Sequence, residues 1–309
     1  MPVFKIQHVT KYEYDEPVRE SVNEIRILPY QCPEQEVLQQ TLHITAQPSV
    51  NTFVDYWGNP TGTFNLLSPH RELVIDNKLI VRTTAPPALE LNYESGFAEL
   101  KKDINGYLRM LELTKPEGIE AKKKIKDIVR PFYKPSKSVA AVAEEASRYI
   151  FENFHYIKGI TNVETTVDEI LEHQSGVCQD FAHVLLQMLR TMNIPCRYVS
   201  GYICPNKNGM RGVGATHAWV EVWIPKQGWT GLDPTNNVWV TNTHVKLAVG
   251  RNFNDCSPIK GTFKGTAEQK LSVYVSVGYE DGNIFEDVNN VNQRYRKEAA
   301  IRQQQQQQQ

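Results

Sequence analysis

Residues 175–183 read SGVCQDFAH, and this stretch marks the start of an amphipathic helix. Apolar side chains follow at helical spacing, at Phe181, Leu185, Met188 and Met192. Gly176 allows a tight turn into the helix, so the pattern predicts Cys178 at its N-terminus. Unpaired amides and the helix dipole there favour a thiolate, the nucleophilic form of cysteine, and can also hold an oxyanion. An inert buried cysteine is the alternative interpretation.

A predicted hairpin supplies the partners that such a thiol needs. Residues 216–223 read THAWVEVW, a strand whose alternation places His217 on a mixed polar face. A turn at 225–228 (PKQG) and a returning strand at 229–234 (WTGLDP) follow. A hairpin centred on Pro225 places His217 opposite Asp233, within reach of a hydrogen bond. Taken alone, the pair could also be an edge-strand histidine bonded to a turn-capping aspartate.

Together the two features predict a catalytic triad. Asp233 would fix the tautomer of His217, whose other nitrogen would face Cys178 and act as general base and acid. This chemistry is acyl transfer through a thioester, and it requires neither a metal nor another cofactor.

Five further residues are candidates for supporting roles. Tyr156 and Gln174 could donate to the oxyanion beside the Cys178 amide. Asp180 is expected to cap free amides or fix a neighbouring loop rather than act directly. The indoles of Trp219 and Trp223 could line a substrate groove or pack in the core.

The chain is predicted to be an α+β protein. Short strands separated by Pro, Gly and Asn turns fill residues 1–85 and predict an N-terminal antiparallel β-sandwich domain. Residues 86–281 combine helical and strand patterns and form the predicted catalytic core, in which the cysteine helix packs on an antiparallel sheet. Residues 282–309 form a polar tail that ends in seven glutamines and is expected to be disordered.

Composition excludes several function classes. Lys plus Arg number 34 against 35 Asp plus Glu, so the net charge of −1 offers no field for nucleic acid or anionic lipid. We find neither a membrane-length apolar run nor a signal-peptide pattern, so a cytoplasmic protein is expected. The five cysteines form no Cys-x-x-Cys pair, which argues against zinc and disulfide frameworks. Calcium loops and the GxSxG, Walker A and HExxH motifs are also absent.

Four segments resemble the bacterial transglutaminase-like family, whose members are often described as cysteine proteases of papain-like architecture. They are GVCQDFAH at 176–183, IPCRYVSGY at 194–202, THAWVEV at 216–222 and LDPT at 232–235. The resemblance implies the same roles for Cys178, His217 and Asp233, with the β-domain preceding a transglutaminase-like core. One departure is GRNFNDCSP at 250–258, where the family leads us to expect Asp and Tyr in place of Asn252 and Phe253.

The expected function is therefore hydrolysis of an amide or peptide bond in a protein or peptide substrate that carries a carboxamide. Two alternatives stay open. One is a protein-glutamine gamma-glutamyltransferase, which resolves the same thioester with a primary amine. The other is a non-catalytic module that binds a partner protein. The oligomeric state is left open by the sequence.

Overall fold

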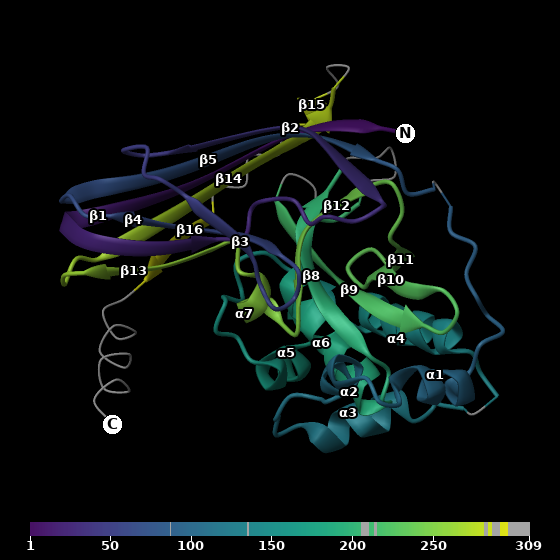
Figure 1. Cartoon of the computed structure of the whole chain (residues 1–309). Helices are drawn as coiled ribbons and strands as arrows, with labels where there is room; N and C mark the ends of the chain where they lie inside the picture. Colours follow the sequence, from purple (N-terminus) through teal and green to yellow (C-terminus); the bar gives the residue numbers. More distant parts are fainter. Residues whose placement is uncertain are drawn as a thin grey trace.

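A large antiparallel sheet packs against a mixed core in the computed structural model of the chain (Figure 1). The structure describes residues 1–86, 88–134, 136–204, 210–212, 215–280, 284–285 and 291–295. The α+β class expected from the sequence is confirmed. Within these residues no helix is long and apolar enough to cross a membrane.

The N-terminal sheet is built around one long strand. Its strands from this part of the chain are β1 (Val3–Ile25), β2 (Gln35–Ile44), β3 (Asn51–Val54), β4 (Pro60–Leu66) and β5 (His70–Thr83). The sequence predicts only short strands here, but residues 4–14 and 22–25 belong to the single strand β1. Irregular pairing around Val18 and a left-handed φ of 50° at Glu20 bend β1 without ending it. Its first part pairs with β5 and its last part with β4, so the sheet is continuous and curled.

Two late strands return to this sheet. β13 (Ile259–Lys264) and β14 (Gln269–Tyr279) both pair with β1, although the sequence analysis grouped them with the core. Two more, β15 (Ile284–Phe285) and β16 (Val291–Tyr295), pair with β14. They are the described part of the predicted tail at 282–309, and the rest of it lies outside the described residues. Strand partners this far apart leave no local pattern in the sequence.

The core holds a second antiparallel sheet, in the order β11-β10-β9-β8-β12. Its strands are β8 (Cys196–Ile203), β9 (Thr216–Ile224), β10 (Gly228–Asp233), β11 (Val238–Trp239) and β12 (His244–Gly250). The main helices are α4 (Val139–Asn153), α5 (Val167–His173) and α6 (Cys178–Thr191). Ser138 caps the N-terminus of α4, where its hydroxyl accepts from the Ala141 amide at 3.2 Å.

Shorter elements complete the core. They are α1 (Phe97–Ile104), α2 (Leu108–Leu113), α3 (Lys122–Val129), α7 (Phe253–Cys256), β6 (His155–Tyr156) and β7 (Ser175–Gly176). The pair β6 and β7 lies directly before the start of α6 and is parallel.

The cysteine helix α6 is buried along its length. Its apolar stripe, predicted from the sequence, packs against the β9 side chains Ala218, Val220 and Val222 in the largest apolar cluster. Full burial of each large apolar side chain stabilises the fold by about 1.5–3 kcal/mol. The position of the Cys178 thiol is therefore fixed by the packing of the whole helix.

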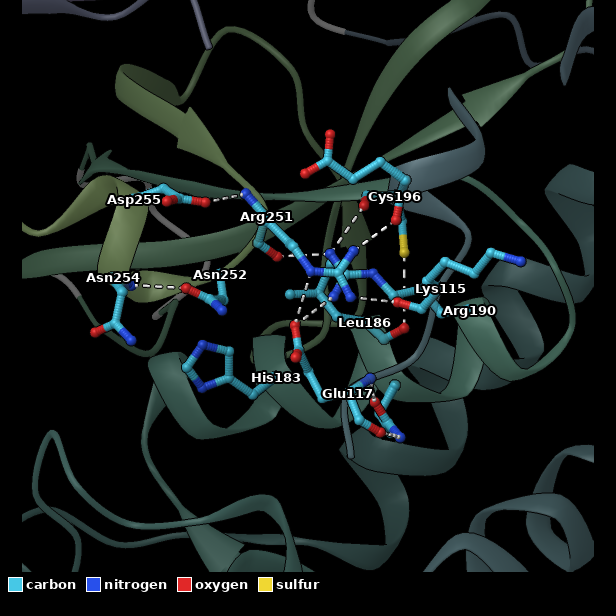
Figure 2. A network of polar contacts seen from close by, with 12 residues as sticks. Lys115, Glu117, His183, Leu186, Arg190, Cys196, Arg251, Asn252, Asn254 and Asp255 are labelled. Carbon is cyan, nitrogen blue, oxygen red and sulfur yellow. Dashed lines mark hydrogen bonds and ion pairs between the residues drawn. The ribbon is translucent and has the colours of Figure 1, made fainter. Parts of the chain in front are cut away.

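An ionic network anchors the far end of α6 (Figure 2). Arg190, whose side chain is 1% exposed, donates to the carbonyls of Cys196 at 3.2 Å and Arg251 at 2.5 Å. Glu117 contacts both guanidinium groups, at 3.4 Å from Arg190 and 3.2 Å from Arg251. These contacts hold the helix at the end opposite Cys178.

The N-terminal sheet is attached to the core along β8 and β12. Asn59, fully buried, donates to the carbonyl of Val249 at 2.8 Å and accepts from its amide at 2.7 Å. His8 lies 2.8 Å from the hydroxyl of Tyr202. Around this contact an apolar cluster joins Phe4 and other side chains of the N-terminal sheet to β8 and β12. The N-terminal sheet is therefore packed onto β8 and β12 of the core sheet.

Candidate active site

Cys178 is the first residue of α6 and is 9% exposed. The Asp180 carboxylate accepts from the amide of Val177 at 2.7 Å and from the hydroxyl of Thr161 at 2.6 Å. A Cβ on Gly176 would lie 2.5 Å from the same carboxylate oxygen, so only glycine fits there. Burial, opposed by these hydrogen bonds, raises the pKa of Asp180. Asp180 therefore caps the cysteine helix and ties down the loop that contains Thr161.

His217 and Asp233 form a buried pair. Nε2 of His217 lies 2.8 Å from Oδ2 of Asp233, and both side chains have 0% exposure. Gly228 pairs with Ile224, which centres the turn on Lys226 rather than on Pro225. His217 is therefore diagonal to Asp233 and not directly opposite. The shift keeps both side chains on one face of the sheet, and diagonal neighbours remain within reach of each other.

Charge within the site favours an imidazolium on His217. Burial opposes this form, but the charges of Asp233 and Cys178 outweigh burial and raise the pKa of His217 to about 10. Burial also disfavours the charged Asp233, yet His217 and His244 hold the pKa of that carboxyl well below its usual range. The pair is thus a buried ion pair at neutral pH.

The second nitrogen of His217 is enclosed next to Gly212. Nδ1 is buried and has no hydrogen-bond partner among the residues that the structure describes. Gly212, with φ of +88°, approaches it so closely that a Cβ there would lie 2.6 Å away. An unpaired buried nitrogen is costly, and Cys178, which helps to raise the pKa of His217, is the neighbouring group that can pair with it.

Besides His217, three residues contact Asp233: Asn236, His244 and Thr235. The Asn236 amide donates to Oδ2 at 2.7 Å, and Nε2 of His244 lies 3.4 Å from the same oxygen. The Thr235 amide donates to Oδ1 at 2.8 Å. Asn236 lies only three residues after Asp233, so the sequence could have suggested this contact. His244 lies in the next long strand, β12, and no local sequence pattern indicates that it contacts Asp233.

The ligand atoms of His217, Asp233 and His244 lie within 4.8 Å of one another, close enough for a metal ion. However, His217 and Asp233 are at hydrogen-bond distance, and Asp233 is surrounded by N–H donors. The arrangement fits a hydrogen-bonded carboxylate better than a set of metal ligands.

Tyr156 lies beside the start of α6 because β6 pairs with β7 there, Tyr156 with Gly176. Burial, and next the charges of Cys178 and Asp233, raise the pKa of Tyr156 far above its usual value. Its hydroxyl therefore stays a hydrogen-bond donor. Gln174 instead ends α5 with a left-handed φ of 47°, and its carbonyl accepts from the His155 amide at 2.8 Å. The contacts described for Gln174 are thus made by its backbone.

The two tryptophans have structural contacts. Trp219 is 1% exposed and packs with Trp57, Val199 and Val249, so it does not line an open groove. The indole N–H of Trp223 donates to Asp103 of α1 at 2.8 Å. Core packing, the alternative left open by the sequence, describes Trp219 better than a groove does.

The residues that depart from the expected pattern form the short helix α7 and its cap. Asn252 caps the short helix α7 by accepting from the Asn254 amide, and the Phe253 amide donates to His183 at 3.2 Å. Burial first, and then the charge of Arg190, lower the pKa of His183 to about 4. His183 is therefore a neutral structural histidine.

Comparison with known proteins gives two family matches. Residues 126–234 match the family described as "Transglutaminase-like superfamily", and residues 4–82 match "Bacterial transglutaminase-like N-terminal region". An uncharacterized protein of Mycobacterium leprae is 31% identical, with 88% of this chain and 97% of that protein covered. A Pseudomonas aeruginosa protein named protein-glutamine gamma-glutamyltransferase is 34% identical over 106 residues, which cover 32% of this chain and 16% of that protein.

Among solved structures, one from Cytophaga hutchinsonii named "Putative Cysteine Protease" matches with a TM-score of 0.69. The match covers 94% of this chain and 96% of that one at 20% sequence identity, a level that shows a shared fold.

Proposed function

Because the chain belongs to the transglutaminase-like superfamily, we propose that it is a thiol-dependent acyl-transfer enzyme acting on amide or peptide bonds. Cys178 is the nucleophile, His217 the general base and acid, and Asp233 the residue that orients His217. The observation that carries the proposal is the buried His217–Asp233 pair at 2.8 Å, whose free nitrogen Nδ1 lacks a partner in the described structure while Cys178 acts on it electrostatically.

The proposed reaction proceeds through a thioester. The Cys178 thiolate attacks the carbonyl carbon, and the oxyanion that forms is held by the amide at the start of α6 and by the Tyr156 hydroxyl. As the C–N bond breaks, the His217 imidazolium gives its proton to the leaving amine. Water, deprotonated by His217, then attacks the thioester and releases a carboxylic acid and the thiol.

We favour hydrolysis as the second step and a carboxamide-bearing protein or peptide as the substrate. The Pseudomonas aeruginosa relative supports a second candidate, transfer of the acyl group from a glutamine side chain to a primary amine. The two reactions share every residue of the triad and differ only in the nucleophile that resolves the thioester. A cytoplasmic location is part of the proposal and agrees with five cysteines that are all unpaired.

Selective alkylation tests whether Cys178 is activated. Burial is the main reason why the pKa values of Cys32 and Cys196 are raised to about 11, and it raises the pKa values of Cys204 and Cys256 well above the ordinary thiol value. Iodoacetamide at pH 7 should therefore modify Cys178 alone, and His217→Ala should slow this modification by at least about tenfold. Peptide mapping by mass spectrometry locates the label, and Cys32→Ser is the control. Equal labelling of all cysteines, or no effect of His217→Ala, would exclude an activated thiol and favour a binding module.

Substrate assays then separate the two reactions. A glutamine-containing peptide is incubated with the enzyme and a labelled primary amine, with Cys178→Ala as the control. Release of ammonia or a peptide fragment without amine incorporation supports hydrolysis, whereas a labelled peptide supports transamidation. If Cys178→Ala acts as well as the wild type, neither proposal holds.

A further inference from the structure

Asp233 is held by more than the histidine it orients. Its side chain has 0% exposure, and Oδ2 lies close to three nitrogen atoms: Nε2 of His217 at 2.8 Å, Nδ2 of Asn236 at 2.7 Å and Nε2 of His244 at 3.4 Å. The amide of Thr235 donates to Oδ1. A second imidazole, that of His244, therefore contacts the Asp233 carboxylate without being a member of the triad.

The contacts of His244 define its tautomer. An ionised carboxylate only accepts hydrogen bonds, so Nε2 of His244 must carry the proton that points to Asp233. Nδ1 lies 3.0 Å from the hydroxyl of Thr243 and accepts from it. Burial disfavours the charged form and lowers the pKa of His244, and the nearby charge of His217 acts in the same direction against the opposing effect of Asp233. His244 is thus a neutral donor beside an ion pair.

The ring of His244 is fixed by its surroundings. It is 5% exposed and stands edge-on to the indole of Trp219, with ring centroids 5.1 Å apart. Its centroid lies 6.0 Å from that of His217, and both imidazoles place Nε2 near Oδ2 of Asp233. The 3.4 Å contact with Asp233 is longer than an optimal hydrogen bond, which makes His244 a weaker partner than His217.

We propose that His244 is a positioning residue of the triad: its Nε2–H holds Oδ2 of Asp233 so that the carboxylate stays directed at His217. The inference rests on the proposed function, because positioning matters only if His217 serves Cys178. His244 acts through Asp233 and does not contact the reacting atoms. Partners that orient a metal-bound histidine change affinity or activity by about 10–100-fold, and by analogy the long contact here places the expected effect near the lower limit.

Two substitutions of similar size separate positioning from packing. His244→Gln keeps an N–H donor near the place of Nε2, whereas His244→Leu fills the space without a donor. We expect iodoacetamide to modify Cys178 about tenfold more slowly in His244→Leu and within about threefold of the wild-type rate in His244→Gln. His8→Leu is the matched control, because His8 is also a buried neutral histidine but binds the Tyr202 hydroxyl rather than Asp233. Its alkylation rate should equal that of the wild type.

Circular dichroism and urea unfolding show whether each variant is folded. Equal rates in wild type and a folded His244→Leu would overturn the inference, as would equal slowing in the Gln and Leu variants. If His244→Leu does not fold, Thr243→Val decides, because it removes the hydroxyl that holds Nδ1 of His244. Slower alkylation in that variant supports the inference, and the wild-type rate overturns it. A wild-type thiol that does not respond to His217→Ala would instead refute the proposed function itself.

Discussion

Removing the charge of Asp233 should abolish most of the imidazolium on His217. The substitution Asp233→Asn keeps the shape of the side chain, so the loss of charge is the main change. Nε2 of His217 and Oδ2 of Asp233 are 2.8 Å apart, which places the two charge centres about 4 Å from each other. With an effective dielectric constant of about 20, the attraction at that separation is about 4 kcal/mol.

This energy corresponds to a large change in protonation. About 4 kcal/mol equals about three pKa units, so the pKa of His217 should fall from about 10 to about 7. At pH 8 the imidazolium fraction then falls from about 99% to about 9%. Since the imidazolium stabilises the adjacent thiolate, alkylation of Cys178 at pH 8 should slow by about tenfold.

Two measurements check the prediction. An NMR titration of the imidazole follows the protonation of His217 directly, and iodoacetamide reports on Cys178. The control is Asp103→Asn, which removes a carboxylate that accepts from the indole N–H of Trp223 at 2.8 Å. A titration midpoint that stays near 10 in Asp233→Asn, or equal effects of the two substitutions, would refute this account of the ion pair.

Three further predictions concern the surroundings of the site. Glu221 is ion-paired with the partly buried Arg197 and Lys246, whose charges outweigh burial and lower the pKa of Glu221 to about 2. Glu221→Gln should therefore lower the free energy of unfolding in urea by about 3 kcal/mol at pH 7, and this difference should shrink as the pH falls from 4.5 toward 2. Gly212→Ala should slow the alkylation of Cys178, because the added Cβ would collide with the His217 ring. Gly106→Ala is the control, because Gly106 has a similar φ of +81° but open space around it. Equal alkylation rates in the two variants would contradict the close approach of Gly212 to His217. Asn59→Ala leaves the carbonyl and the amide of Val249 in β12 without their side-chain partner, and it should lower the free energy of unfolding by about 1–3 kcal/mol for each of these groups. An unchanged urea midpoint would argue that Asn59 does not attach the N-terminal sheet to the core.

Local patterns predicted the elements of the site well. Helix α6 starts at Cys178, as predicted, and its apolar stripe is buried. The hairpin also forms, because a short loop between two alternating segments brings neighbouring strands together. The register of the hairpin differs from the predicted one, because the turn is centred on Lys226 rather than on Pro225. Lys226 and Gly228 both adopt a positive φ in this turn, a conformation that residue spacing alone does not specify.

Contacts between distant segments could not be predicted in the same way. The return of β14 to β1 joins residues more than 250 positions apart, as in the pairing of Lys11 with Ser272. The approach of His244 to Asp233 depends on where β12 enters its sheet, and the burial of Trp219 depends on Trp57 from the N-terminal sheet. Each of these requires packing that no local periodicity encodes.

The sequence by itself determined which residues begin the cysteine helix and which strands carry His217 and Asp233, because capping, periodicity and turn chemistry act over a few residues. Tertiary structure alone decided that Asp233 meets His217 diagonally, that His244 contacts the same carboxylate, and that the last long strand completes the first sheet. The physical reason is that these arrangements arise from the burial of apolar faces and of charged groups between distant segments, and such burial is a property of the folded chain as a whole.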